Sequence, residues 1–111
     1  MTVVDPTPAS HAFGVELGQF DGRLVLRLCG DLDSQSAPEL RDLIDELAID
    51  GDTVLDLEEL TFIDSSGLGC LFRLQQRVAD AGGLVEAHGA CPQVRHAIQM
   101  VQLNRVMAVL Q

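Results

Sequence analysis

Two stretches near the start of the chain alternate apolar and polar residues, which is the pattern of half-buried β-strands. The first covers residues 13–19 and the second covers residues 23–30. Asp21 and Gly22 stand between them and form the residue pair favoured in two-residue hairpin turns. The pattern therefore predicts a β-hairpin at the start of the fold.

A helical spacing of apolar residues follows the hairpin. Leucine or isoleucine occupies positions 40, 43, 44 and 47, which corresponds to i, i+3, i+4 and i+7 on one helix face. Ser36 and Glu39 have the spacing of a capping box, and Pro38 falls in the first turn. We therefore expect an amphipathic helix that Ser36 caps and whose outer face is acidic.

Strands and helices then alternate to the end of the chain. We expect strands at residues 53–57, 84–89 and 105–110, with residues 58–63 forming a turn. A helix that opens at Ser65 is expected to bury Leu68, Leu71, Phe72, Val78 and Ala79, and a last helix over residues 91–101 is expected to bury Val94, Ala97, Ile98 and Val101.

Helices of this length between strands imply crossover connections and a largely parallel sheet. The predicted fold class is α/β, with the order β-β-α-β-α-β-α-β. The sheet is mixed but mostly parallel, because it begins with a hairpin, and the helices pack over it.

The length and the cysteines indicate one cytoplasmic domain. A chain of 111 residues is sufficient for a single core. Residues 1–12 are expected to form a flexible tail, and residues 13–111 the domain. The start lacks the features of a secretion signal, and no apolar run approaches the roughly 20 residues that span a bilayer. Cys29, Cys70 and Cys91 show no C-x-x-C spacing, which favours buried thiols in a reducing compartment.

The charge of the chain excludes one class of partner. The net charge is −10, all seven basic residues are arginine, and the sequence contains no Trp or Tyr. Nucleic-acid binding needs a basic surface and often stacking aromatic residues, so this composition speaks against it. Residues 1–64 carry fifteen acids and three arginines. This asymmetry is suited to steering a basic protein partner, although solubility alone also accounts for it.

Motifs of enzymes and metal sites are missing from the sequence. The serine nucleophile elbow G-x-S-x-G lacks its first glycine at either serine, a P-loop requires lysine, and the third glycine of a dinucleotide fingerprint is replaced by Phe72. Cysteine and histidine residues do not cluster at metal-ligand spacing. We therefore expect no catalysis, no metal and no cofactor.

The stretch "LTFIDSSGLG" is the candidate functional element. An apolar run ends in Asp64, Ser65 and Ser66, and a helix is expected to start there. Such residues are preferred helix caps worth on the order of 1 kcal/mol, and most sequences of this kind do nothing else. The alternative is that one of the two hydroxyls reacts.

The surroundings of this stretch resemble the STAS domain of bacterial anti-sigma factor antagonists. In that family an aliphatic strand, such as "TVLDL" here, leads through a phenylalanine to D-S-S-G-L and an amphipathic helix. The second family marker, G-x-L-D, corresponds to "GDLD" at residues 30–33. The resemblance covers residues 13–110, the folded part of the expected STAS domain. The chain departs from it in ending soon after the last strand, where many members carry another helix, and in having Cys70 where an aliphatic residue is common.

The resemblance implies roles for residues in both markers. Ser65 corresponds to the phosphoacceptor of the family, and Ser66 is a less favoured alternative or second acceptor. The residues expected to contact a partner are Asp33, Ser34, Asp64, Ser66 and Gly67.

By the same resemblance, the unphosphorylated protein binds an anti-sigma factor that is a serine kinase. Binding frees a sigma factor for transcription, phosphorylation of Ser65 ends the complex, and a serine phosphatase restores it. Two alternatives stay open. One is a STAS module of another system, such as a stress-signalling scaffold or a transporter accessory subunit. The other is a nucleotide-binding or weakly hydrolysing enzyme. The identity of the sigma factor, the oligomeric state and a redox role of the cysteines are also open.

Overall fold

The structure is a computed structural model that describes residues 12–110. The tail expected over residues 1–12 lies outside the described residues, apart from Ala12. Five strands form a single sheet in the order β1-β2-β3-β4-β5 within this described part. They are β1 (Gly14–Phe20), β2 (Arg23–Leu32), β3 (Thr53–Ile63), β4 (Val85–His88) and β5 (Ala108–Leu110).

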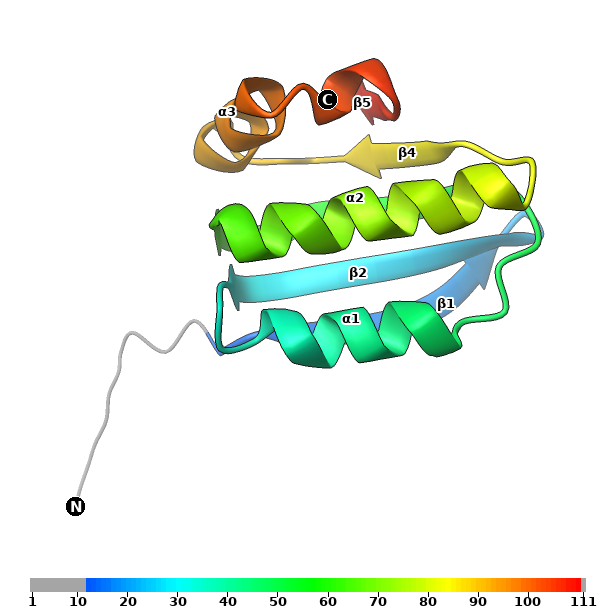
Figure 1. Cartoon of the computed structure of the whole chain (residues 1–111), viewed down its shortest axis with the longest axis horizontal. Coiled ribbons are helices and arrows are strands. Elements are labelled where there is room, and N and C mark those ends of the chain that lie inside the picture. Colours follow the sequence, from blue (N-terminus) through cyan, green and yellow to red (C-terminus); the bar gives the residue numbers. More distant parts are fainter. Residues whose placement is uncertain (1–11, 111) are drawn as a thin grey trace.

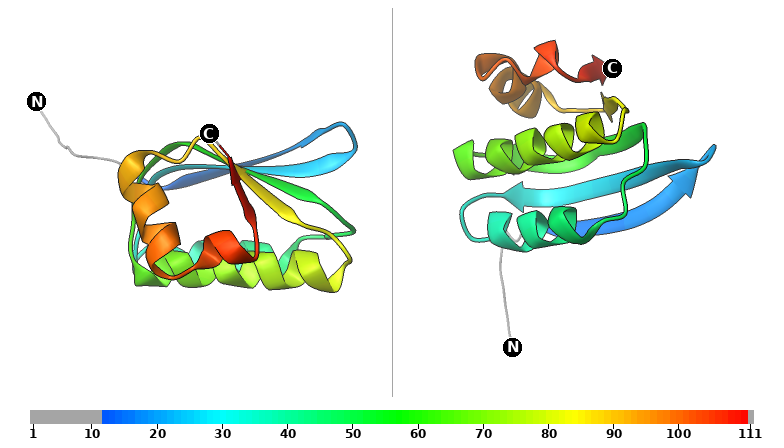
Figure 2. Two further views of the ribbon diagram at one scale, coloured as in Figure 1. Left: turned by 90° about the horizontal axis from the view of Figure 1, so that it is seen from above. Right: turned by 45° about the vertical axis from the view of Figure 1, so that its right-hand side comes forward.

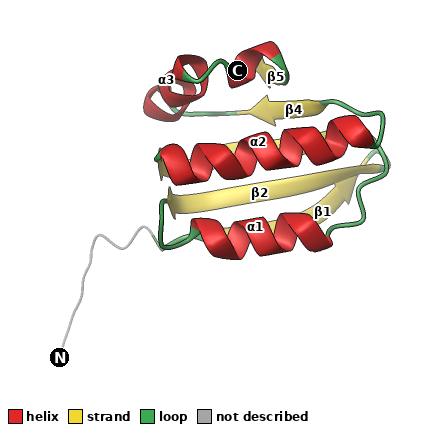
Figure 3. Ribbon diagram, viewed as in Figure 1, coloured by secondary structure: helices red, strands yellow, loops and turns green. Residues whose placement is uncertain are grey.

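The helices are α1 (Ala37–Glu46), α2 (Ser65–Asp80) and α3 (Pro92–Met100), with a short 3₁₀ turn, η1 (Leu103–Arg105), before β5. Figure 1 and Figure 3 show α1 and α2 lying side by side over the same face of the sheet. Seen from above in Figure 2, the opposite face of the sheet carries no helix of the described chain, and α3 lies toward one end. No helix of residues 12–110 is both long enough and apolar enough to cross a membrane.

The predicted hairpin and the mixed sheet are confirmed. β1 pairs with β2 in antiparallel fashion, whereas β2–β3, β3–β4 and β4–β5 are all parallel pairs. Asp21 and Gly22 connect the hairpin with φ of 55° and 75°. Two consecutive positive φ angles are those of a type I′ turn, whose twist matches that of the strands it joins. The order β-β-α-β-α-β-α-β is therefore the observed one.

The core lies between the sheet and the helices and is built mostly of leucine. Buried side chains alternate along β2, so that one side of the strand faces the helices and the other faces outward. The fully buried large side chains are Leu26, Leu28, Leu32, Leu40, Ile44, Leu55, Leu57, Leu60, Leu71, Leu74, Val78 and Ile98.

β3 is longer than the sequence predicted, because residues 58–63 continue the strand and do not form a turn. Along the β2–β3 ladder, Arg27 pairs with Asp56 but Cys29 pairs with Glu59, and a second skip follows between residues 30 and 31. Each skip places one additional residue on β3, which defines a β-bulge. Buried residues therefore fall at 57, 60 and 63 rather than at every second position. Because the apolar residues in this part of β3 are three positions apart and do not alternate, the sequence pattern there did not indicate a strand.

The expected capping box at the start of α1 is wrong. Ser36 occupies the N-cap position but makes no side-chain cap hydrogen bond. Its hydroxyl instead donates to the carbonyl of Asp31 at 2.9 Å and accepts from the amide of Asp33 at 3.0 Å. The Asp33 carboxylate accepts the amides of Gln35 at 3.0 Å and Ser36 at 3.3 Å. The loop before α1 is thus held by the Asp33 carboxylate, and the Ser36 hydroxyl adds two hydrogen bonds to the backbone of the same loop.

The buried faces of two helices also differ from expectation. On α2, Phe72 and Ala79 are exposed, whereas Cys70 and Leu74 are buried. The reason is that α1 packs against the side of α2 that carries Cys70 and Arg73 and does not cover the opposite side. In the third helix region, Val101 lies just beyond α3 and is exposed.

Candidate functional site

Asp64 is the cap of α2, which answers the question raised by the two serines that follow it. Its backbone is extended, and its carboxylate oxygen Oδ1 accepts the amide hydrogens of Ser66 at 2.9 Å and Gly67 at 3.1 Å. These amides are among the orphan donors of a helix N-terminus. Because the aspartate satisfies them, neither serine hydroxyl is needed as a cap.

Ser65 is the first residue of α2 and is exposed to solvent. No hydrogen bond engages its hydroxyl within residues 12–110. One turn further along the helix, Gly69 is exposed, and no atom outside its own helix lies within 4 Å of the place that a Cβ would occupy. The hydroxyl is therefore accessible to another protein, whereas Ser66 is partly buried.

Gly67 allows the first turn of α2 to lie directly against the end of β2. A Cβ at this position would lie 2.7 Å from Ile63 Cγ1, 2.7 Å from Leu32 Cγ and 2.8 Å from the Leu32 carbonyl oxygen. Distances below 3.0 Å essentially do not occur for a real Cβ. Gly67 is buried, so its role in the structure is close packing and not an exposed surface.

The loops after β2 and β3 lie side by side at the carboxyl edge of the sheet. Leu32 pairs with Ile63 in the parallel ladder, and the amide of Asp64 donates to the carbonyl of Leu32 at 3.2 Å. Asp33 and Ser34 therefore leave the sheet next to Asp64 and Ser65. The structure brings together the residues of the two sequence markers, although they are about thirty positions apart in the chain.

Two arginines of α2 join it to α1. Arg73 donates to the Asp45 carboxylate from both Nε and Nη2, the latter at 3.1 Å. The hydrogen bond from Arg73 lowers the pKa of Asp45 and correspondingly raises the pKa of Arg73. Arg77 donates from Nη1 to the carbonyls of Ile44 and Leu47 at the end of α1. Lone carbonyls at a helix C-terminus attract cationic side chains of this kind.

Cys70 completes the contact between the two helices. It is fully buried, and its thiol donates to the carbonyl of Ala37, the first residue of α1, at 3.3 Å. Burial raises the pKa of Cys70, which disfavours the reactive thiolate. All three cysteines are free thiols in the structure.

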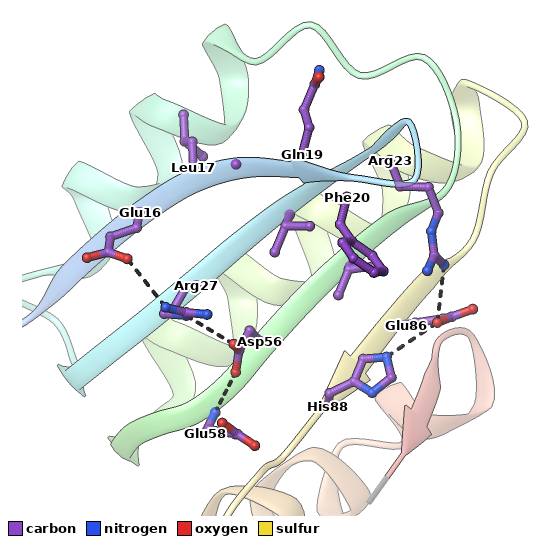
Figure 4. A pocket seen from close by; sticks show the side chains of 13 residues that line it. Glu16, Leu17, Gln19, Phe20, Arg23, Arg27, Asp56, Glu58, Glu86 and His88 are labelled. Carbon is purple, nitrogen blue, oxygen red and sulfur yellow. Dashed lines mark hydrogen bonds and ion pairs between the residues drawn. The ribbon is translucent and has the colours of Figure 1, made fainter.

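A hollow of about 570 Å³ lies elsewhere, on the open face of the sheet (Figure 4). Most of its charged side chains pair with one another, the exception being Glu58. Arg27 contacts Asp56 at 3.0 Å and Glu16 at 3.7 Å. Glu86 contacts both Arg23 and His88 at 3.3 Å. None of the site residues expected from the sequence line this hollow.

This charged face was not among the surfaces expected from the sequence. The signal was present in the polar positions of the alternating strands, because the residues between the buried leucines of β2 must point away from the core. The part of the chain described by the structure holds no group of three or more His, Cys, Asp or Glu residues placed to bind a metal ion.

Comparisons with known proteins agree with this fold and with the family expected from the sequence. The family model described as "Mlab, STAS domain" matches residues 16–111. An anti-sigma F factor antagonist of Paenibacillus polymyxa is 31% identical over 99 residues, which cover 86% of this chain and 84% of that protein.

Solved structures show the same similarity. An anti-sigma factor antagonist from Mycobacterium paratuberculosis has a TM-score of 0.76 at 26% identity, over 92% of this chain and 88% of the other. The anti-sigma factor antagonist SpoIIAA in its unphosphorylated form has a TM-score of 0.71 at 26% identity, over 90% and 89%. The Bacillus protein SpoIIAA in its phosphorylated form has a TM-score of 0.60 at 25% identity, over 90% and 92%.

The fold and the paired loops thus define a STAS domain. The chain belongs to the STAS-domain family and is related within it to the anti-sigma factor antagonists.

Proposed function

We propose that this protein is an anti-sigma factor antagonist controlled by phosphorylation of Ser65. Unphosphorylated, it binds an anti-sigma factor that is a serine kinase, and the sigma factor held by that kinase is set free. Phosphorylation of Ser65 ends the complex, and a serine phosphatase restores it. In this proposal the chain acts as a ligand and a substrate and not as a catalyst.

The observation that carries the proposal is the state of the Ser65 hydroxyl. It is exposed and free of hydrogen bonds within the described residues, at a helix N-terminus that Asp64 already caps. The similarity to SpoIIAA, which has been solved both without and with its phosphate, supports the assignment of this serine. Asp33 and Ser34 leave the sheet in the neighbouring loop. Together with Asp64 and Ser66 they are proposed to contact the partner, whereas Gly67, which is buried, is proposed to support this surface from inside.

The structure suggests how a phosphate would act. It would add about −1.5 to −2 charges next to the carboxylates of Asp64 and Asp33. The amides of Ser66 and Gly67, which would be the natural donors to a phosphate, already bind Asp64 Oδ1. The new charge therefore stays at the surface, where a docked partner would have to desolvate it.

The resulting loss of affinity is large, and the effect on the fold is small. Desolvating an unpaired charge in an interface costs several kcal/mol. Since each ~1.4 kcal/mol is a tenfold change, a loss of about two to three decades in affinity is expected. Because Ser65 is exposed, the phosphate makes no clash inside the domain, so the modification blocks contact and leaves the fold unchanged.

The test is an incubation of the purified protein with a serine-kinase anti-sigma factor from the same genome and ATP. We expect the intact mass to rise by one phosphate, which peptide mapping places on Ser65. Ser65→Ala should abolish the modification, whereas Ser66→Ala, the neighbouring control, should retain it. The modified protein should bind the kinase at least a hundredfold more weakly, and treatment with a serine phosphatase should restore binding. Modification of Ser66 alone, or full-strength binding of the phosphorylated protein, would refute the proposal.

A further inference from the structure

Phe72 is a large apolar side chain that the fold leaves half exposed. Its exposed fraction is 47%, although the other large apolar residues of the same helix are buried. It lies on the side of α2 that α1 does not cover, since Arg73 and Arg77 of the same helix point to α1. The core of the domain therefore does not account for an aromatic residue at this position.

Phe72 shares one side of α2 with Ser65. The two residues are seven positions apart, which is close to two helical turns and about 10 Å along the axis. Gly69 lies between them on the same side and has no side chain to interrupt the surface. Ser65, Gly69, Phe72 and Gln76 thus form one exposed, uncharged stripe, which we call the Ser65 stripe.

The surface beside this stripe is acidic. Arg73 is exposed, but the carboxylate of Asp45 neutralises it. On α1, which packs alongside α2, Arg41 is exposed as well. The exposed acids Glu39, Asp42 and Glu46 outnumber it, and no ion pair within the described chain neutralises them, so the surface of α1 is net negative. A partner that covers both helices therefore meets the uncharged Ser65 stripe, with Phe72 as its one large apolar side chain, bordered on one side by net negative charge.

We infer that Phe72 is an apolar anchor for the same protein that contacts Ser65. This inference rests on the proposed function. It extends the proposed contact surface from Ser65 along two turns of α2. The fitting partner surface is an apolar pocket wide enough for an aromatic ring, bordered by arginine or lysine side chains on the side that faces α1. Phe72 binds and orients the kinase domain of the anti-sigma factor relative to Ser65, but it takes no part in phosphate transfer.

The expected effect follows from the area that Phe72 still exposes. Roughly half of a phenylalanine side chain remains to be buried, at about 25 cal/mol per Å² of apolar area. An aromatic residue near the centre of an interface is a common hot spot. We expect Phe72→Ala to weaken binding of the unphosphorylated protein about 10- to 100-fold. Phe72→Leu should recover most of that loss.

Phe20 provides a matched control. It is a phenylalanine with an exposed fraction of 64%, and it projects from the hairpin over the open face of the sheet (Figure 4), opposite the helices. Phe20→Ala should leave the affinity unchanged. The experiment measures the dissociation constants of wild type, Phe72→Ala, Phe72→Leu and Phe20→Ala for the serine-kinase anti-sigma factor by calorimetry. Thermal unfolding of each variant checks that the domain is folded.

A kinetic readout separates anchoring from a merely structural role. Phe72→Ala should raise the KM for phosphorylation of Ser65 and leave kcat close to that of wild type, because the phenylalanine lies about 10 Å from the hydroxyl.

The outcomes distinguish this inference from the proposed function. If wild type binds and Phe72→Ala binds as tightly as wild type, the anchor is refuted while the proposed function stands. The same holds if Phe72→Ala and Phe20→Ala weaken binding to the same extent. If wild type neither binds nor is phosphorylated, both fail. Selective weakening by Phe72→Ala, with recovery in Phe72→Leu, supports the anchor.

Discussion

Gly67 offers the sharpest test of how the site is assembled. Replacing it with alanine adds one methyl group at a point where three atoms lie closer than 3.0 Å to the new carbon. Two of these atoms belong to Leu32, and one of the two is its backbone carbonyl oxygen, which also accepts the amide of Asp64. A flexible side chain cannot relieve that contact. The first turn of α2 must therefore move away from the end of β2.

The magnitude follows from two opposing effects. Overpacking of a tight site costs about 1–3 kcal/mol, and weakening the hydrogen bond between Asp64 and Leu32 adds about 1 kcal/mol. Alanine in place of glycine in a helix recovers at most about 1 kcal/mol. We expect the free energy of unfolding to fall by about 2 kcal/mol, which corresponds to a decrease in Tm of about 5–10 °C for a domain of this size.

Gly69→Ala is the matched control. It makes the same change two residues further along the same helix, where no neighbouring atom lies within 4 Å. It should raise the free energy of unfolding by about 0.5–1 kcal/mol through helix propensity alone. Urea unfolding followed by circular dichroism measures both variants. A Gly67→Ala protein as stable as wild type would refute the account of how the two loops are held together.

Three smaller effects can be tested in the same way. Asp64→Ala removes the acceptor for two amides of α2 and should lower the free energy of unfolding by about 1 kcal/mol in urea, whereas Asp64→Ser should retain most of it. The pKa of Asp45 is lower in the folded protein than in the unfolded chain. Its carboxylate therefore contributes fully to stability above the unfolded aspartate pKa of about 3.9, and this stabilisation is lost as the pH falls through the lower folded pKa. Thermal unfolding should thus show Asp45→Asn as less stable than wild type at pH 7, and the difference should shrink as the pH falls below the unfolded pKa and through the lower folded pKa. Cys70 should react with iodoacetamide more slowly than the other two cysteines, since it is buried and its pKa is raised, and equal rates by mass spectrometry would contradict this.

The order of elements was predictable because each element carries its own periodicity. The alternation before and after Asp21 and Gly22 defined the hairpin, and the leucines at 40 and 43 defined α1. The end of β3 was not predictable in this way. Its bulges arise from pairing with β2, and a strand with buried residues three apart has no recognisable pattern in a single sequence.

The site was partly predictable for a related reason. The junction of strand and helix at Asp64 was evident from local residue types, and the family resemblance singled out Ser65. The exposure of Phe72 was not predictable from the sequence. The apolar residues Leu68, Leu71 and Val78 define the centre of the buried face of α2, but they do not decide which adjoining side of the helix is also covered. Only the position of α1 decides which flank is covered. That position depends on contacts such as the one between Arg73 and Asp45, which lie far apart in the sequence.

The two arginine contacts between α1 and α2 have a consequence for the speed of recognition. Arg73 and Arg77 hold the two helices as one body, so a partner that spans both finds its docking surface already ordered. Ordering a flexible side chain on association costs about 0.5–1.5 kcal/mol. In this protein the two arginine side chains are already ordered in the folded domain, so binding does not include that cost. Association is then limited by diffusion and orientation and not by rearrangement, with rate constants of about 10⁵–10⁷ M⁻¹s⁻¹. Loosening these helices should slow complex formation even where every residue that touches the partner is unchanged.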